Sequence, residues 1–187
     1  MKVYICKNER INSREFAKMC LRDYTGETQT DFTFVESEFG KPLIDGVHDL
    51  HFSLSHSSFD GRAILICAVA RFNIGADCQI INIKDTARCR KIAERFYSPH
   101  ENLFLNRLPE SDYTDNFFKI WTKKEAYIKY TGKGLAEGLS TFSVLSLDSV
   151  RFKRIAPELS GAYIYLCCSK ADSLDGLEVR QVCSDTF

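Results

Sequence analysis

Residues 121–135, with the sequence WTKKEAYIKYTGKGL, give the strongest structural signal in this chain. Good helix formers run from Phe117 to Tyr130, and Gly132 and Gly134 follow them. This pattern predicts a helix that the glycines terminate. The candidates for its N-cap are Asp112, Thr114 and Asp115.

One sector of this predicted helix combines an acid with a lysine. Trp121, Glu125 and Lys129 recur every four residues, so their side chains lie on the same side of the helix. In one interpretation, Glu125 and Lys129 form a surface ion pair worth about 0.2–0.5 kcal/mol, and Trp121 packs in the core. In the other, the carboxylate and the surrounding lysines hold a metal-bound polyphosphate. The rest of the chain has to decide between them.

Composition limits the kinds of partner. The 187 residues are 44% hydrophobic, which is enough to bury a core in one domain or in two small halves. Lys plus Arg and Asp plus Glu number 25 each. Because there is no global basic field, a nucleic-acid partner is not expected, and any anion site must be built locally.

The cysteines indicate a reducing compartment. There are eight, they include no CxxC pair, and most lie in apolar segments, so we predict reduced core thiols in a cytoplasmic protein. The four histidines are not spaced with them as ligand pairs, so zinc is not expected. The N-terminal MKVYICKNER is too short and too interrupted for a secretory signal. No apolar run is long enough to span a membrane.

Local signals predict an α+β domain in two comparable halves, 1–84 and 85–187, with residues 80–84 as the crossing. Helices are expected from Asn12 to Gly26, from Asp85 or Thr86 to Arg95, and from Ser98, where Pro99 and Glu101 complete a start signal. Strands are expected near residues 3–5, 32–36, 50–54, 63–71, 73–79, 142–147, 163–166 and 178–183. The short turns between 50–54, 63–71 and 73–79 favour antiparallel pairing of these three strands.

Two short segments carry residues suited to phosphate. In GKP, residues 40–42, Pro42 stiffens a loop in which Lys41 is a positive charge, although an ordinary solvated lysine would look the same. In FSLSHS, residues 52–57, hydroxyls flank His56, and such groups donate hydrogen bonds to phosphate oxygens. A Ser-His-Asp hydrolase is disfavoured, because adjacent strand side chains point to opposite sides and no GxSxG motif is present.

A third segment, IGADCQ at residues 74–79, places Asp77 and Gln79 on one face of an apolar strand and Cys78 on the other. A buried acid needs a salt bridge or a metal, and Gly75 allows another backbone or a ligand to approach closely. Asp77, Gln79 and Glu125 together would supply the oxygen ligands that Mg²⁺ prefers. The groups that would neutralise the remaining phosphate charge are Lys41, His56, Lys124 and Lys129.

Taken in order, GKP, SLSHS, IGADCQ and WTKKEAYIKYTGKGL resemble the motifs of the 4'-phosphopantetheinyl transferases, specifically the single-chain surfactin-synthetase-activating type. The resemblance spans roughly residues 38–145. It implies the α+β fold of that family, with two pseudo-symmetric α/β halves in one chain, each an antiparallel sheet packed with a long helix. It also implies transfer of the phosphopantetheine arm of coenzyme A to a serine of an apo acyl or peptidyl carrier protein, releasing 3',5'-ADP.

The resemblance implies roles for individual residues. Asp77 and Glu125 match the metal-binding acids, whereas Gln79 stands where many members have glutamate, so we expect weaker Mg²⁺ binding. Glu125 would take the proton of the attacking serine, and Lys129 would stabilise or protonate the leaving group. The residues implied in coenzyme A binding are Lys41, Pro42, Ser55, His56, Lys124 and Lys129, with Arg14 placed near the 3'-phosphate by its position alone.

The sequence says less about how a carrier protein would be recognised. A basic surface, comprising Lys84, Arg88, Arg90 and Lys91, suits an acidic carrier protein but equally suits a solvated helix face. A monomer is expected, because both halves lie in one chain. The alternative function is that of a catalytically weakened paralogue that binds coenzyme A or a carrier protein, with Gln79 as its signature.

Overall fold

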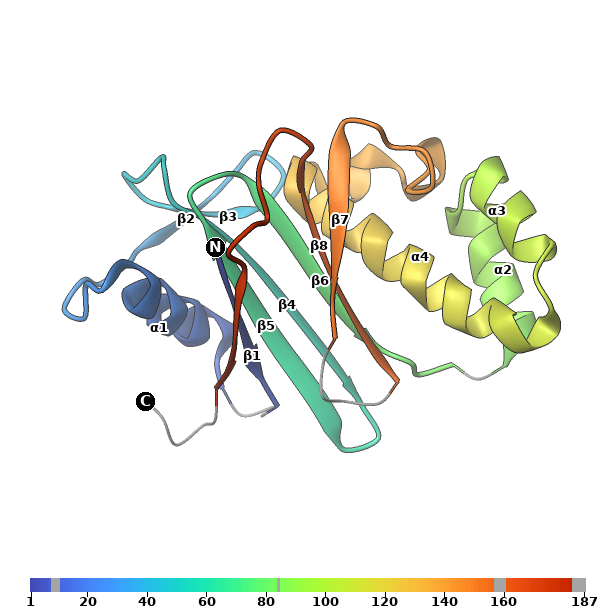
Figure 1. Cartoon of the computed structure of the whole chain (residues 1–187), viewed down its shortest axis with the longest axis horizontal. Helices are drawn as coiled ribbons and strands as arrows, with labels where there is room; N and C mark the ends of the chain where they lie inside the picture. The colour runs from blue at the N-terminus through green and yellow to red at the C-terminus, as the bar shows by residue number, and fades with distance from the viewer. Residues whose placement is uncertain (8–10, 84, 157–160, 183–187) are drawn as a thin grey trace.

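The computed structural model describes residues 1–7, 11–83, 85–156 and 161–182 (Figure 1). Its helices are α1 (Ser13–Thr25), α2 (Thr86–Phe96), α3 (Pro99–Asn106) and α4 (Glu110–Thr131). Its strands are β1 (Lys2–Cys6), β2 (Phe34–Glu36), β3 (Pro42–Ile44), β4 (His51–Phe59), β5 (Arg62–Ala70), β6 (Ile74–Ile80), β7 (Val150–Ile155), β8 (Ala162–Ser169) and β9 (Glu178–Val182). Short 3-10 turns at Gly134–Glu137 and Leu139–Thr141 follow α4.

The strands form two main sheets and a small hairpin. The first sheet has the order β4-β5-β1-β9, the second has the order β6-β8-β7, and β2 pairs with β3. All pairs are antiparallel except β1 with β9, which is parallel. The α+β fold class is confirmed.

The sheets do not divide the chain at residue 84, the predicted boundary, which lies outside the described residues. β6 precedes that residue but pairs with β8, and β9 comes from the end of the chain but pairs with β1. The short turn between β5 and β6 therefore joins two sheets, and the antiparallel pairing expected there is wrong, whereas that of β4 with β5 is confirmed.

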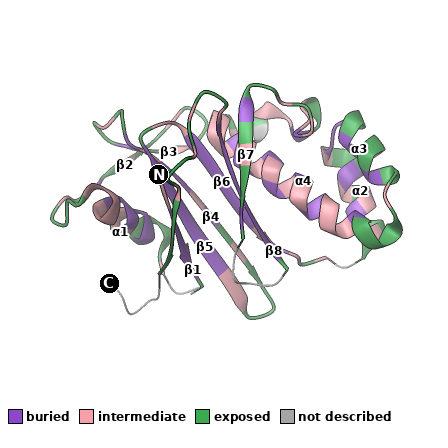
Figure 2. Ribbon diagram, viewed as in Figure 1, coloured by how far each residue is buried: buried purple, intermediate pink, exposed green. Residues whose placement is uncertain are grey.

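Strict alternation along the strands builds four layers, α1, first sheet, second sheet and α4 (Figures 1 and 2). On β5, Ile64, Ile66 and Ala68 pack between the two sheets, whereas Leu65, Cys67 and Val69 pack towards α1. On β8, Ile164 and Leu166 face the core between the sheets, and Tyr163 and Tyr165 pack with residues of α4. The second sheet thus presents a whole face to α4.

Local capping explains where most helices begin and end. Asn12 caps α1 and Gly26 ends it in a left-handed conformation with φ 78°, while Asp85 caps α2. Ser98 and Glu101 form the predicted capping box at α3. These three predictions are confirmed.

The predicted N-cap of α4 is wrong. The helix starts at Glu110, directly after Pro109, and no side chain caps it. Asp112 and Glu110 instead lie in its first turn, where acids interact favourably with the helix dipole. Its C-terminus agrees with the prediction, because Gly132 adopts φ 73° there.

One strand prediction near the C-terminus is wrong, and one strand is not predicted. Residues 142–147 alternate apolar side chains with serines but form turns, and Val144 donates its backbone N–H to Glu101 at 2.8 Å. The sequence of β7, VRFKRI, does not indicate a strand because Arg151, Lys153 and Arg154 interrupt its apolar pattern. Burial of Val150 and Ile155 at its two ends holds that strand against β8.

The described cysteines, Cys6, Cys20, Cys67, Cys78, Cys89, Cys167 and Cys168, are free and buried, as predicted, while Cys183 lies outside the described residues. None of the helices in the described part of the chain combines the length and the hydrophobicity needed to cross a bilayer.

Candidate active site

The site begins with the alternation of β6. Ile74, Ala76, Cys78 and Ile80 pack between the sheets, which turns Gly75, Asp77 and Gln79 to the face that α4 covers. A Cβ added to Gly75 would lie 2.0 Å from the Ala126 carbonyl oxygen and 2.4 Å from the Tyr130 amide nitrogen. The glycine therefore admits a backbone, that of α4, and this close packing brings Glu125 and Lys129 over Asp77.

Asp77 is the most buried of the predicted site residues that touch the pocket described below, with 5% of its surface exposed. Its Oδ1 atom accepts one hydrogen bond from Lys129 Nζ at 2.7 Å and another from Ser55 Oγ at 2.7 Å. The lysine comes from α4 and the serine from β4, so three elements meet at one carboxylate oxygen.

Glu125 faces this group from α4. Burial raises the pKa of its carboxyl, the nearby Asp77 carboxylate raises it further, and Lys129 opposes both effects. Among the described residues, Glu125 has no recorded hydrogen bond or ion pair. Its carboxylate is thus a partly buried acid whose oxygens have no partner within residues 1–7, 11–83, 85–156 and 161–182.

A pocket of about 260 Å³ collects these groups. Asp77, Glu125, Lys129 and Gln79 line it, together with Trp121, His56, Ser55 and Ser13 at the start of α1. We call this the acid pocket. The sequence prediction that Asp77, Gln79 and Glu125 come together in space agrees with this lining.

The residues present fit a hard divalent cation. Two carboxylates and one amide line the acid pocket, and all three can offer oxygen ligands. Gln79 donates its Nε2 to the Ile80 carbonyl oxygen at 2.9 Å, so its amide oxygen remains as the possible ligand. A single lysine for two acids leaves a net negative site.

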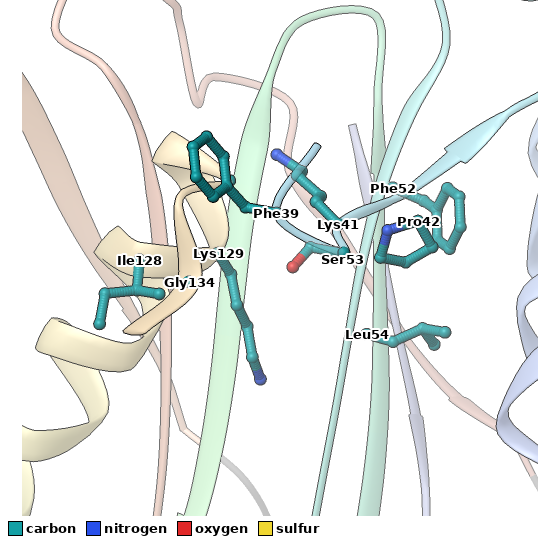
Figure 3. A pocket seen from close by; sticks show the side chains of 11 residues that line it. Phe39, Lys41, Pro42, Phe52, Ser53, Leu54, Ile128, Lys129 and Gly134 are labelled. Carbon is teal, nitrogen blue, oxygen red and sulfur yellow. The ribbon is translucent and has the colours of Figure 1, made fainter. Parts of the chain in front are cut away.

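A second pocket of about 240 Å³ adjoins the acid pocket, because Leu54 and Lys129 line both. Its other walls are the GKP loop with Phe39 and Pro42, strand β4, and the glycines after α4 (Figure 3). Its surface is largely apolar, and Phe39 is half exposed at its edge. We call this the loop pocket.

Lys41 does not line the acid pocket that holds Asp77 and Glu125. Its Nζ donates to Asn73 Oδ1 at 2.7 Å and to the Tyr130 carbonyl oxygen at 3.2 Å, so it ties the GKP loop to the C-terminus of α4. Figure 3 shows its side chain running away from that of Lys129. Burial lowers the pKa of Lys41 to about 8. These internal acceptors hold its ammonium, and Lys41 also lines the loop pocket, so its contact with a phosphate stays a prediction.

The expectation that Lys124 faces a phosphate is wrong. Its side chain is fully buried, and its Nζ bonds Glu101 Oε2 at 2.5 Å and the Phe142 carbonyl oxygen at 2.7 Å. Lys124 follows Lys123 and precedes Glu125, so helix geometry turns it about 100° from the acid, into the packed core. Arg14 is exposed and pairs with Glu36 at 3.7 Å, and it does not line the acid pocket, so its contact with the 3'-phosphate stays a prediction.

The sequence does not predict the contacts that the structure gives to Glu101 and Ser55. Glu101 was assigned only to a capping box, yet it also holds Lys124 and the Val144 amide. Ser55 was expected to bind phosphate, yet its hydroxyl contacts Asp77. Each partner is more than twenty residues away in sequence, and no local pattern signals such pairs.

Comparison with known proteins assigns the family. A model of the 4'-phosphopantetheinyl transferase superfamily matches residues 73–175, more than half of the chain. The chain is 31% identical to the 4'-phosphopantetheinyl transferase gsp of Aneurinibacillus migulanus, over 80% of this chain and 63% of that protein. It is 33% identical to a 4'-phosphopantetheinyl transferase of Bacillus subtilis, over 79% and 68%, and 39% identical to Sfp of Bacillus subtilis strain 168, over 62% and 48%.

A family model that matches more than half of the chain and relatives above 30% identity assign the family: the chain belongs to the 4'-phosphopantetheinyl transferase superfamily. It spans about half to two thirds of the length of these curated relatives.

Proposed function

We propose that this protein transfers the 4'-phosphopantetheine arm of coenzyme A to a serine of an apo acyl or peptidyl carrier protein and releases 3',5'-ADP. The observation that carries the proposal is the meeting of Asp77, Glu125 and Lys129 in the acid pocket, next to the loop pocket. We further propose that it acts as a monomer in the cytoplasm.

In the proposed reaction, the serine Oγ of the carrier forms a bond to the β-phosphorus of coenzyme A. The bond from that phosphorus to the bridging oxygen breaks, and 3',5'-ADP leaves. Glu125 takes the serine proton. Lys129 lines both pockets, so its ammonium can offset the charge that develops on the leaving group.

Magnesium is the proposed cofactor. Asp77, Glu125 and the Gln79 amide oxygen would hold it, and when bound it would neutralise charge on the pyrophosphate. Because Gln79 contributes no negative charge, we expect a Gln79→Glu variant to need less Mg²⁺ for half-maximal transfer. An unchanged or higher requirement would argue that residue 79 is not a ligand.

Coenzyme A is proposed to lie along the two pockets. Its pyrophosphate would sit at Lys129 and the acid pocket, and its flat, weakly polar adenine suits the apolar loop pocket between Phe39 and Pro42. His56 is exposed and lines the acid pocket, which leaves its ring available to a phosphate.

One experiment tests the activity. The protein is incubated with coenzyme A, Mg²⁺ and an apo carrier protein, and the carrier is then weighed by mass spectrometry. We expect the mass of one phosphopantetheine arm to be added by the wild type and not by Glu125→Gln, and we expect this variant to keep the fold. Near-normal transfer by the variant would remove the assigned role of Glu125. Binding of coenzyme A by the wild type without any mass gain would favour the paralogue that only binds.

The carrier is proposed to dock on α2. Of the basic residues predicted there, Arg90 is engaged with Glu110 at 2.7 Å, and Lys84 lies outside the described residues. Arg88 and Lys91 are exposed and remain candidates for contacting an acidic partner. Replacing both by glutamate should raise KM for the carrier and leave KM for coenzyme A unchanged. Equal changes in both constants would count against this surface.

A further inference from the structure

A ladder of serine side chains joins the two main sheets. Ser53, Ser55 and Ser57 of β4 accept hydrogen bonds from the backbone N–H groups of Ala76, Cys78 and Ile80 of β6, at 2.9, 3.2 and 3.0 Å. Each bond links residues 23 positions apart, so the two strands stay in step along the whole ladder. The hydroxyls take the place of a backbone ladder between edge strands.

The middle serine differs from the other two. Its Oγ accepts from the Cys78 N–H and donates its one proton to Asp77 Oδ1 at 2.7 Å. Ser55 is also buried, with 6% of its surface exposed. A hydroxyl whose proton is already donated has none to give to a phosphate oxygen, so the role implied by the family resemblance does not match this geometry.

The two hydrogen bonds to Asp77 both end on the same carboxylate oxygen. Oδ1 receives both Ser55 and Lys129, whereas no hydrogen bond to Oδ2 is recorded in the part of the chain that the structure describes. Two donors from different elements hold a carboxylate plane in a way that one flexible lysine does not. Because Asp77 lines the acid pocket, Oδ2 is the oxygen that remains for a ligand there.

We infer that Ser55 is a positioning residue, which fixes the Asp77 carboxylate so that Oδ2 is presented to a divalent cation. The inference rests on the proposed function, since that function needs the cation. Loss of the Ser55 hydroxyl frees the carboxylate to rotate, so cation affinity falls by about 10–100-fold, the range typical of outer-shell partners. Direct binding of coenzyme A phosphates does not change.

Ser55→Ala is compared with Ser57→Ala, which removes an equivalent ladder bond but lies outside the acid pocket. Mn²⁺ affinity is measured by electron paramagnetic resonance with saturating coenzyme A, and coenzyme A affinity by calorimetry in EDTA. We expect about 10–100-fold weaker Mn²⁺ binding for Ser55→Ala only, unchanged coenzyme A affinity in EDTA, and near-wild-type Mn²⁺ binding for Ser55→Thr, which keeps the hydroxyl.

The inference is overturned if Ser55→Ala binds Mn²⁺ like the wild type, if Ser57→Ala weakens Mn²⁺ binding equally, or if Ser55→Ala loses coenzyme A affinity in EDTA. If the alanine variant does not fold, Ser55→Cys takes its place, because a thiol is a weak donor of similar size. Transfer to the carrier is scored separately on the wild type. If the wild type transfers the arm normally and Ser55→Ala binds Mn²⁺ like the wild type, the inference is rejected and the proposed function stays intact.

Discussion

Two lysines of helix α4, Lys124 and Lys129, are five residues apart and each pairs with a carboxylate from another element, but the two pairs differ in how completely they are satisfied. In the pair of Lys124 with Glu101, both side chains are fully buried. In the pair of Lys129 with Asp77, the side chains are 30% and 8% exposed. The first pair is closed on all sides by protein, whereas the second opens into a pocket.

Hydrogen bonding explains the contrast. Glu101 accepts from the Ser98 backbone and hydroxyl and from the Val144 amide in addition to Lys124, and the lysine also donates to the Phe142 carbonyl. At the second pair, one carboxylate oxygen of Asp77 accepts two hydrogen bonds, and Glu125 has no hydrogen-bond or ion-pair partner among the described residues. A buried ion pair therefore marks a site only where oxygens remain for a ligand.

Breaking the closed pair should have the largest effect on stability. We expect Lys124→Met to lower the free energy of unfolding by roughly 3–5 kcal/mol, because it leaves Glu101 as a buried charge without its counter-ion. Urea denaturation followed by circular dichroism measures this. The double variant Lys124→Met, Glu101→Leu should recover part of the loss, since no unpaired charge remains. A single variant as stable as the wild type would contradict the structural role of this pair.

Gly75→Ala should disturb the open pair by moving its helix. The new methyl group would overlap the α4 backbone at Ala126 and Tyr130, so we expect a loss of about 1–3 kcal/mol. As α4 shifts away from β6, Lys129 should also lose its short contact with Asp77. Unfolding by urea and the Mn²⁺ affinity are therefore measured together. A stable variant with unchanged Mn²⁺ affinity would show that the close packing does not set the site.

The same contrast distinguishes the features that can be predicted from the sequence, which are local, from those that cannot. The caps at Asn12, Asp85 and Ser98 are recognisable because their partners lie within three residues. The alternation of Asp77 with Gln79, and the four-residue spacing of Glu125 and Lys129, are local patterns as well, and strand and helix geometry alone assign these side chains to the correct faces.

Long-range partners are not predictable in this way. Lys124 and Glu125 are neighbours in one motif, and only the position of α3 shows that the lysine has a partner 23 residues away. The pairing of β6 with β8 likewise depends on which sheet face is covered, and no turn signal encodes it. The family resemblance implies Asp77 and Glu125 as acids of the site, but it does not imply the hydrogen bond from Ser55 to Asp77, which depends on how closely two sheets pack.

Lys129→Met tests the open pair directly. We expect transfer to be lost, while the free energy of unfolding falls by only about 1–2 kcal/mol, because Ser55 still donates to Asp77 and water reaches the pocket. Mass spectrometry of the carrier and urea denaturation give the two numbers. A stability loss as large as that of Lys124→Met would erase the distinction between the two pairs.

Glu125→Gln should have the smallest effect on stability and the opposite sign. Burial and Asp77 raise the pKa of Glu125, so the folded state binds its proton more tightly than the unfolded state does. The charged carboxylate therefore costs stability as the pH rises above the ordinary glutamate value. In EDTA at pH 7 we expect the glutamine variant to be more stable by roughly 0.5–1 kcal/mol, a gain typical of neutralising a functional group. The gain should shrink as the pH falls towards 4, where the wild-type carboxyl is protonated in the folded state. Urea denaturation of both proteins across this range measures it, and a gain that grows on acidification would mean that the folded protein stabilises Glu125 as an anion.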